Sequence, residues 1–396
     1  MHPLTGSIKR YDWGSHDAIP AILGIEDDGR PLAEYWLGAH PSGPARIDDG
    51  VPLDDAISQN PAMAGDSTRL EFEGRLPYLM KLLSAGRPLS LQAHPNRIDA
   101  QAGFARENAE EIPLDAPERT FKDPWDKPEL LIALTEFDAL AGFRAPEASA
   151  ELFAGLGICN DSQKVFTPLL SRGGRAGLAE VFMNCLVTDD ERTAAVTDVV
   201  AAAINHVDDE GELGDFARTA VTLDEHFPGD PSLLAALLLT RHHLKPGEAL
   251  YLQPGRLHSY LHGTGVEVMG NSDNVLRGGL TSKHIDPSAL AQVVNFTTIP
   301  IVPMLAEQEL PGLWRYPTDE RSFACWRLEL IPGRMIELPG ELSGRILLAT
   351  RGEIGVSQGQ DDLVLVQGQA AFLEAGRQVQ ISGDGQGFLT ATGMDA

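Results

Sequence analysis

The chain has 396 residues, 43% of them hydrophobic and 22% charged, and its formal net charge at pH 7 is −26. A chain of this size and composition has enough apolar side chains to bury the cores of two or three domains. Its acidic balance argues against nucleic acid and anionic lipid as partners, because proteins bind both through basic surfaces.

Nothing in the sequence indicates a membrane or secreted protein. No apolar run is long enough to cross a bilayer, and the first residues lack the apolar core and cleavage site of a secretion signal. Cys159, Cys185 and Cys325 lie far apart and form no CxxC pair, so no cysteine zinc site or disulfide framework is indicated. We therefore expect a cytoplasmic protein without a nucleic-acid or membrane partner.

Short β-like runs alternate with turns in the first sixty residues. Residues 8–10, 33–37 and 45–47 are predicted strands of a mixed sheet, and residues 56–60 a short helix.

Two further strands follow. Residues 79–83 are an apolar run typical of a buried strand, and residues 89–94 alternate with period two. The alternation places Ser90, Gln92 and His94 on one face, with Gln92 and His94 about 7 Å apart along the strand. A metal ion can bridge such a pair, although a histidine on a sheet is usually only hydrogen-bonded.

Residues 99–108 are predicted to be an exposed helix and residues 110–120 a polar loop. Two prolines then lead irregularly to Glu129, which opens an apolar strand over residues 130–135. A carboxylate at the mouth of a buried strand is a second candidate ligand. The alternative is a simple ion pair between Glu129 and Lys127.

Alanine- and leucine-rich segments at helical spacing follow and predict an inserted helical subdomain. Asp189, Asp190 and Ser232 are reasonable N-caps. No ligand set is recognisable there. The predicted helices are residues 148–156, 178–186, 190–205, 216–226 and 232–244.

The stretch from residue 247 to residue 286 combines apolar strand positions, glycines, histidines and charged side chains. Glu267, Asp273, Arg277 and Lys283 would lie near one another, which is costly unless they are paired, solvated or bound to a ligand. Asp286 is a predicted cap for a helix over residues 287–296.

From residue 304 onward the chain is β-rich again. The pattern suits a jelly-roll β-sandwich, so the expected fold class is mainly β with an inserted helical subdomain. The strand-length runs, broken by glycine, are residues 323–331, 345–349, 352–357, 362–366 and 370–373.

Four candidate ligands emerge from these segments. Gln92, His94, Glu129 and His258 offer two imidazoles, a carboxylate and an amide oxygen, a plausible set for a borderline ion such as Zn²⁺. Their spacing alone does not join them, because they lie on three distant segments.

Several longer motifs are more specific. With them, the chain resembles the type I mannose-6-phosphate isomerases (phosphomannose isomerases), zinc enzymes of the cupin fold. The motifs are YDWGS at residues 11–15, AEYWLGAHPSGPA at 33–45, LPYLMKLLSAGRPLSLQAHPN at 76–96, DKPELLIAL at 126–134 and GVEVMGNSDNVLRGGLTSKHID at 265–286.

The resemblance implies one Zn²⁺ per chain, held by Gln92, His94, Glu129 and His258. It also implies a catalytic cupin domain over residues 1–145 and 242–303, a helical insertion over 146–241 and a C-terminal cupin-like β domain over 304–396. The remaining site positions that it implies are Arg277, Glu267, Asp273 and Lys127 as catalytic residues, and Lys81, Ser90, Tyr260 and Lys283 as substrate-binding residues.

One position departs from the family. Many members carry Asn-His before Lys-Pro-Glu, where this chain has Trp125-Asp126. A histidine there would be a natural acid or base, so its absence bears on proton transfer and on sugar selectivity.

The implied reaction interconverts mannose 6-phosphate and fructose 6-phosphate through an enediolate, and so supplies mannose for GDP-mannose and glycoconjugates. It needs a base and positive charge beside the sugar oxygens. Glu267 and Asp273 are the available carboxylates, and a zinc-bound hydroxide is the other candidate base. Alternatives are an isomerase of another, unphosphorylated sugar and a non-catalytic sugar-binding cupin. A monomer or weak homo-oligomer is expected.

Overall fold

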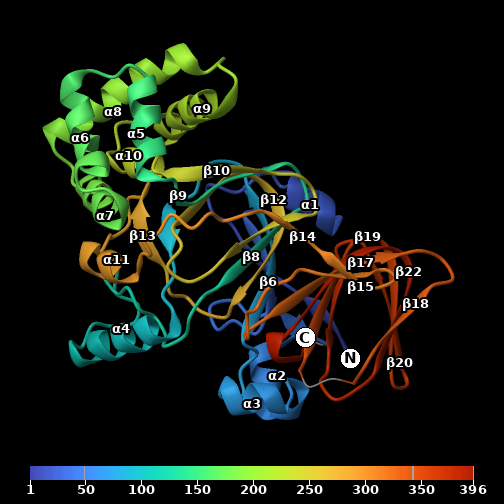
Figure 1. Cartoon of the computed structure of the whole chain (residues 1–396). Coiled ribbons are helices and arrows are strands. Elements are labelled where there is room, and N and C mark those ends of the chain that lie inside the picture. Colours follow the sequence, from blue (N-terminus) through green and yellow to red (C-terminus); the bar gives the residue numbers. More distant parts are fainter. Residues whose placement is uncertain (49, 341–342, 396) are drawn as a thin grey trace.

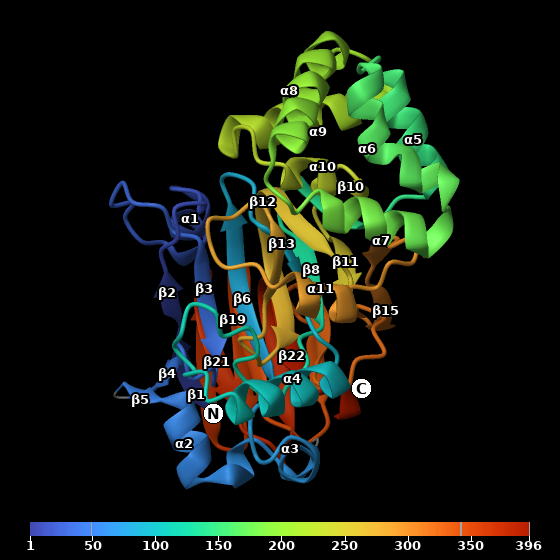
Figure 2. The same cartoon turned by 90° about the vertical axis from the view of Figure 1, so that its left-hand side faces the viewer.

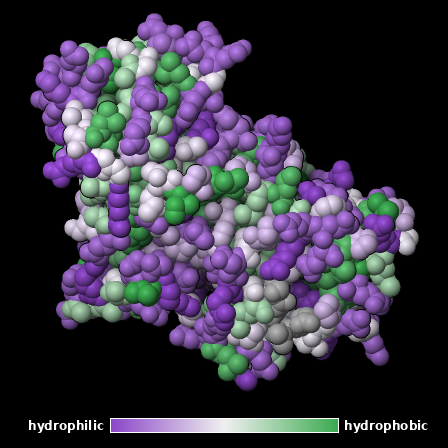
Figure 3. Space-filling view, in the orientation of Figure 1, coloured by the Kyte–Doolittle hydropathy of each residue, from purple (hydrophilic) through white to green (hydrophobic). Residues whose placement is uncertain are grey.

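A computed structural model describes residues 1–48, 50–340 and 343–395. Two large antiparallel sheets pack against each other through one apolar layer, and a cluster of helices lies at one end (Figure 1). The predicted fold class, mainly β with a helical insertion, is confirmed. Hydrophilic side chains cover most of the face shown in Figure 3, and hydrophobic ones appear there in scattered groups.

The first sheet contains the strands that surround the predicted site. Its central strand is β12, which pairs with β6 and β8 along residues 263–270 and with β7 and β9 nearer its start. The described strands of this sheet are β2 (Ser7–Lys9), β3 (Glu34–Gly38), β6 (Tyr78–Ala85), β7 (Leu91–Ala93), β8 (Glu129–Ala133), β9 (Phe137–Phe143), β10 (Leu239–Leu244), β11 (Glu248–Leu252), β12 (His258–Gly270), β13 (Leu276–Gly279) and β14 (Met304–Leu305).

The second sheet holds the C-terminal strands. Its strand β1, near the N-terminus, pairs with β21, and β4 pairs with β1, so residues near both ends of the chain share this sheet. The division of the chain into three domains stays a prediction. The described strands are β1 (His2–Thr5), β4 (Arg46–Ile47), β5 (Val51–Pro52), β15 (Glu307–Leu310), β16 (Leu313–Arg315), β17 (Ala324–Leu330), β18 (Met335–Leu338), β19 (Arg345–Gln358), β20 (Asp361–Val366), β21 (Ala370–Leu373) and β22 (Val379–Ala391).

Strand alternation gives the first sheet two different faces. On β6, Tyr78, Met80 and Leu82 enter an apolar layer shared with the second sheet, whereas Lys81 and Leu83 point to the opposite side. The Tyr78 hydroxyl crosses the layer and donates to the backbone oxygen of residue 344 at 2.8 Å. One face therefore anchors the sheet, and the other is free to build a site.

Helices α5 to α10 form the cluster beyond β9 and β10 (Figure 1 and Figure 2). Asp189 caps α8 as predicted, accepting from the backbone of Arg192, whereas Ser232 lies inside α10 and is not its N-cap. In the described part of the chain the cluster comprises α5 (Pro146–Gly155), α6 (Asn160–Ser171), α7 (Gly174–Asn184), α8 (Asp190–Ala203), the 3₁₀ turn η2 (Ile204–His206), α9 (Gly211–His226) and α10 (Ser232–Ala236).

The prediction of one helix over residues 232–244 is wrong in its second half. The helix ends at Ala236, and residues 239–244 form β10, which pairs with β9. Pairing with a neighbouring strand overrides the helical propensity of this leucine-rich run. Helix α6 was not predicted.

Shorter helices complete the fold. Asp286 caps α11 by accepting from the backbone of Ser288 and Ala289, as predicted. Among the described residues, no helix combines the length and apolar character needed to span a bilayer. The remaining described helices are α1 (Ala18–Leu23), α2 (Leu53–Gln59), η1 (Pro61–Met63), α3 (Asp66–Glu71), α4 (Arg97–Ala109), α11 (Pro287–Val293) and η3 (Gly393–Asp395).

Candidate active site

The inner face of the first sheet lines a hollow of about 960 Å³, which we call the central hollow. His226 and Phe227, at the end of α9, also line it, so the helical cluster contributes to its wall. The predicted site residues that line the central hollow are Lys81, Ser90, Gln92, Lys127, Glu129, His258, Tyr260, Glu267, Asp273, Arg277 and Lys283.

Three of the predicted metal ligands meet at its floor. Ligand atoms of His94, Glu129 and His258 all lie within 4.8 Å of one another, and the three residues are buried. Glu129 stands between the histidines, with Oε1 3.1 Å from His94 Nε2 and Oε2 3.2 Å from His258 Nε2. The structure thus brings together residues that the sequence spacing could not join.

Backbone carbonyls fix the two imidazoles. Nδ1 of His94 lies 2.8 Å from the carbonyl oxygen of Asn274, and Nδ1 of His258 lies 3.1 Å from that of Arg256. A carbonyl oxygen only accepts, so each Nδ1 carries the proton and each Nε2 offers a lone pair. Lone pairs of imidazole and carboxylate then face one another, which is the arrangement of a metal site.

The charge state agrees with cation binding. Burial lowers the pKa of His94 to about 4, so this imidazole is neutral at pH 7. Nε2 of His94 is buried without a hydrogen-bond partner. These residues fit a divalent cation, which would occupy the space between the lone pairs.

Gln92 belongs to the same corner of the hollow. It lies on β7 opposite His258 on β12 and opposite Arg277 on β13. Its Nε2 lies 3.3 Å from Ser90 Oγ, which is its hydrogen-bond acceptor. The predicted common face of Ser90 and Gln92 is confirmed by their shared exposure to the hollow.

A buried ion-pair cluster forms the wall beside this corner. Lys81 Nζ lies 2.8 Å from Glu34 Oε1 and 2.5 Å from Glu267 Oε2. The Tyr260 hydroxyl donates to Glu267 Oε1 at 2.6 Å, and the Trp36 indole donates to Glu34 Oε2 at 3.0 Å. Burial would lower the pKa of Lys81, but the carboxylates of Glu267 and Glu34 raise it, so Lys81 stays charged.

Further cations line other parts of the hollow. Arg277 projects from β13, and burial lowers its pKa, although a guanidinium remains protonated. Burial, and then the charge of Arg277, lower the pKa of Lys283, which indicates that the two cations share a region of the hollow. Lys127 lies with its Nζ 3.7 Å from Glu129 Oε1, as the simpler interpretation of that pair expected.

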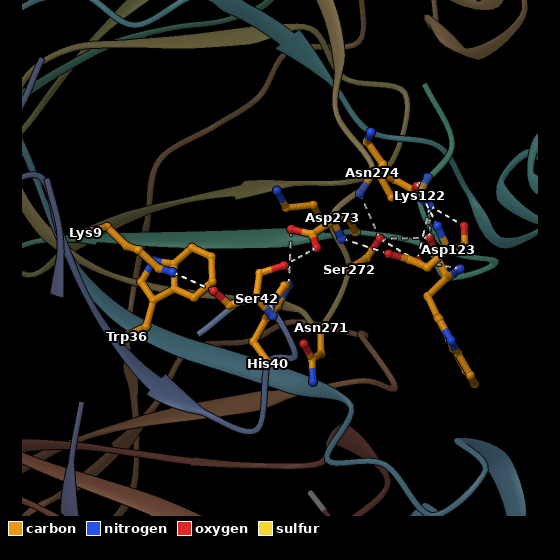
Figure 4. A network of polar contacts seen from close by, with 12 residues as sticks. Lys9, Trp36, His40, Ser42, Lys122, Asp123, Asn271, Ser272, Asp273 and Asn274 are labelled. Atoms are coloured by element: carbon orange, nitrogen blue, oxygen red, sulfur yellow. Dashed lines mark hydrogen bonds and ion pairs between the residues drawn. The ribbon is translucent and has the colours of Figure 1, made fainter. Parts of the chain in front are cut away.

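Asp273 reaches the hollow from the loop between β12 and β13. It accepts a hydrogen bond from the Ser42 hydroxyl at 2.7 Å, and its Oδ1 lies 3.5 Å from His40 Nε2 (Figure 4). His40 Nδ1 accepts from the backbone N–H of Ser42 at 3.1 Å, so the ring proton is on Nε2 and faces Asp273. Burial lowers the pKa of His40 to about 4.

Comparisons with known proteins identify the family. A family model described as phosphomannose isomerase type I, catalytic domain, matches residues 1–146. The chain is 36% identical to the mannose-6-phosphate isomerase of Salmonella typhimurium over 98% of each chain, and 31% identical to that of Rattus norvegicus over 96% of this chain and 94% of the relative.

The chain belongs to the type I phosphomannose isomerase family.

Solved structures of the family share the whole fold. The Salmonella typhimurium mannose 6-phosphate isomerase, bound to fructose 6-phosphate and zinc, superposes with a TM-score of 0.89 at 35% identity over 99% of both chains. A structure of mannose 6-phosphate isomerase with zinc and yttrium gives a TM-score of 0.88. The predicted family resemblance is confirmed.

Trp125 and Asp126, which replace the Asn-His of many phosphomannose isomerases, lie outside the lining of the central hollow. The Trp125 ring is stacked between the guanidinium groups of Arg97, 3.7 Å from the ring centroid, and Arg75, at 4.7 Å. Asp126 pairs with Arg97 at 3.5 Å. Both side chains are thus held by contacts with arginines.

Sequence reasoning gave no site role to several residues of the hollow wall, among them Tyr11, Glu34, Trp36 and His40, which were quoted only within motifs. Glu34 could have been singled out from the sequence, because it is the only charged residue in the otherwise apolar predicted strand over residues 33–37. The pairing of β3 with β6, which places Trp36 opposite Lys81, was not readable from the sequence.

Proposed function

We propose that this chain interconverts mannose 6-phosphate and fructose 6-phosphate at one zinc ion held by Gln92, His94, Glu129 and His258. The observation that carries the proposal is the convergence of the two Nε2 lone pairs and the Glu129 carboxylate on one buried point of the hollow. Membership of the family, and the zinc and fructose 6-phosphate bound by a relative with the same fold, support it.

Zinc bound there would supply a Lewis acid for the C1 and C2 oxygens of the sugar. Arg277, on the strand beside Gln92, would stabilise the negative charge of an enediolate. Lys283 provides a further cation, suited to the sugar phosphate. Ser90 and Tyr260 line the hollow and would orient the sugar hydroxyls.

A proton must leave C2 and return to C1, or the reverse, through a group on the wall. Glu267 and Asp273, which both line the hollow, are the proposed carboxylate bases. Both oxygens of Glu267 are engaged, by Lys81 and Tyr260, whereas Asp273 is partly exposed to the hollow. Lys127, beside Glu129, is the remaining proposed catalytic group. Incorporation of solvent deuterium at C2 by Glu267→Gln and Asp273→Asn variants would separate the two carboxylates, because only loss of the base stops exchange.

The test of the function is removal and return of the metal. A chelator should abolish conversion of mannose 6-phosphate, and added Zn²⁺ should restore it. His258→Ala should lose zinc. Arg277→Ala should keep zinc but lose a factor of about 10²–10³ in kcat, as removal of a stabilising donor does. Full turnover by the metal-free protein would overturn the proposal.

A second measurement addresses the alternatives. The cations Arg277 and Lys283 in the hollow favour a phosphorylated substrate. We expect a much higher kcat/KM for mannose 6-phosphate than for free mannose. Equal values would favour an isomerase of unphosphorylated sugars, and zinc binding without any isomerisation would favour a sugar-binding cupin.

The cellular setting is part of the proposal. We propose a cytoplasmic protein that acts as a monomer or weak homo-oligomer. Its net charge of −26 supports the absence of a nucleic-acid partner. Sedimentation at micromolar concentration and fractionation of cells check these statements, and a tight oligomer or an extracellular location would contradict them.

A further inference from the structure

Asn274 is fully buried beside the central hollow and ties two loops together (Figure 4). Its Nδ2 donates to the carbonyl oxygens of Asp123 and Trp125, each at 2.8 Å, and its Oδ1 accepts from the backbone N–H of Lys122 at 2.7 Å. The NH₂ group of the amide therefore faces two carbonyl oxygens, and its oxygen faces an N–H group. Turning the amide over would break all three hydrogen bonds, so its orientation is fixed.

The backbone of the same residue holds the metal ligand. The carbonyl oxygen of Asn274 accepts the Nδ1 proton of His94 at 2.8 Å. Partners of this kind set the tautomer and ring direction of a ligating histidine. The side chain of Asn274 thus fixes the position of its own carbonyl, and the carbonyl fixes the direction in which His94 presents Nε2.

Asp123 completes the connection between the loops. Its carboxylate accepts from the Ser272 hydroxyl and from the backbone N–H of Asp273, both at 2.8 Å. It also accepts from the backbone N–H of Trp125 at 3.0 Å. The segment that presents Asp273 to the hollow and the segment that orients His94 are therefore held by one network.

We propose that Asn274 is a positioning residue for the metal site, acting through the orientation of His94. The inference rests on the proposed function, because it needs the zinc site. Loss of the carboxamide would remove these partners from the carbonyl of Asp123 and the N–H of Lys122. It would leave the carbonyl of Trp125 with the Ser272 hydroxyl, at 3.2 Å, in place of two donors. The loop, and with it the carbonyl that faces His94, would lose its fixed place.

The same loop offers a matched control. Asn271 is also buried, and its Nδ2 also donates to two carbonyl oxygens, those of Leu76 at 2.9 Å and Ala39 at 3.4 Å. These contacts anchor the loop to a part of the chain away from His94. Asn274→Ala and Asn271→Ala therefore remove similar bonds from one loop, and only the first removes the support of the His94 partner.

Zinc affinity is the decisive measurement, made by competition with a coloured chelator. We expect Asn274→Ala to bind Zn²⁺ about 10- to 100-fold more weakly than the wild type, the usual effect of losing a partner that orients a metal ligand. Asn271→Ala should stay close to the wild type. The visible absorption spectrum of the Co²⁺-loaded protein should change in Asn274→Ala only, because it reports the ligand geometry.

Unchanged zinc affinity in Asn274→Ala, or an equal loss in Asn271→Ala, would overturn the positioning role while leaving the proposed function intact. Failure of the wild-type protein to bind zinc would instead overturn the proposed function, and the inference with it. If Asn274→Ala does not fold, Asn274→Asp serves the same test. It keeps the size and the acceptor for Lys122 but lacks the donor, and the same loss of affinity is expected.

Discussion

Each of the two sheets buries one face against the other sheet and turns its second face to an interior of its own. The interior of the second sheet is filled with apolar side chains, including Leu347, Ile354 and Leu389. The interior of the first sheet is the central hollow, with Lys81 and Glu267 in its wall. From residue 304 onward the sequence contains neither lysine nor histidine, the residue types that the hollow uses for charge and metal binding.

The two sheets share an architecture but differ in role: the interior of the second stabilises the fold, and the interior of the first carries the candidate site. A filled apolar interior stabilises the fold by roughly 25 cal/mol for each Å² removed from water. A hollow lined with charges loses that contribution and adds the cost of burying ions. The apolar layer between the sheets, to which β6 contributes Tyr78 and Met80, holds the strands that carry the charges. The second sheet therefore supports the polar wall of the first.

The largest loss of stability is expected when the ion-pair cluster of the hollow is broken. In Lys81→Met, the carboxylates of Glu34 and Glu267 are left buried without their cation. We expect the free energy of unfolding to fall by about 3–5 kcal/mol and turnover to be lost. Urea unfolding and the isomerase assay measure both. Lys164→Met, at an exposed pair with Asp161, is the control and should leave the free energy of unfolding close to that of the wild type. Equal losses in the two variants would contradict the comparison.

A cavity made in the filled interior of the second sheet should cost a similar amount of stability but should leave catalysis unchanged. Leu347 is fully buried in the apolar interior of the second sheet. Leu347→Ala should lower the free energy of unfolding by about 3 kcal/mol, because it leaves a cavity. The kcat of the folded fraction should stay at the wild-type value. A large fall in kcat at a temperature where the variant is folded would show that the two interiors are not independent.

The stability of the metal-free protein should depend on pH through His40. The pKa of His40 is about 4 when folded and 6.5 when unfolded, so the unfolded chain binds more protons between these values. Stability is therefore fully present above pH 6.5 and is lost as pH falls toward 4. For His40 the loss from pH 6.5 to pH 5 is about 2 kcal/mol.

His94 has the same shift and adds a parallel loss in the wild type. The charged groups that face His40 are Asp273, Lys127, Arg75 and Lys81. The measurement is therefore the difference in unfolding free energy between wild type and His40→Gln at several pH values. We expect this difference to shrink as the pH falls below 6.5. A difference independent of pH would contradict the buried, neutral state of His40.

Much of the fold was predictable because burial on one face imposes a two-residue period. This period predicts the strand that contains Gln92, and a continuous apolar run predicts the strand around Lys81. β22 was missed because glycines at 383, 385 and 387 interrupt its apolar pattern, and pairing with β17, β18 and β19 supplies what local propensity lacks. The leucines of β10 predict a helix instead of a strand, because leucine suits both structures.

The candidate site was predictable where the residue type itself restricts the chemistry. His94, Glu129 and His258 are unusual in apolar strands, and the family resemblance then grouped them. Asn274 gave no such signal, because its role depends on contacts across about 150 residues of sequence. Glu34 likewise acquires its role from Lys81, its partner on the neighbouring strand β6. Long-range pairing is the information that a single sequence does not display.

The smallest expected effect compares two tyrosines on the two faces of the first sheet. Tyr260→Phe removes a hydrogen bond to a buried carboxylate in the hollow, and Tyr78→Phe removes bonds to neutral carbonyls in the apolar layer. Each should cost about 1–2 kcal/mol of stability. Only Tyr260→Phe should also lower kcat. Glu267 loses the hydrogen bond from Tyr260, and its contact with Lys81 then changes. A kcat reduced equally by both variants would mean that the hollow responds to the packing behind it, and that the two faces act together.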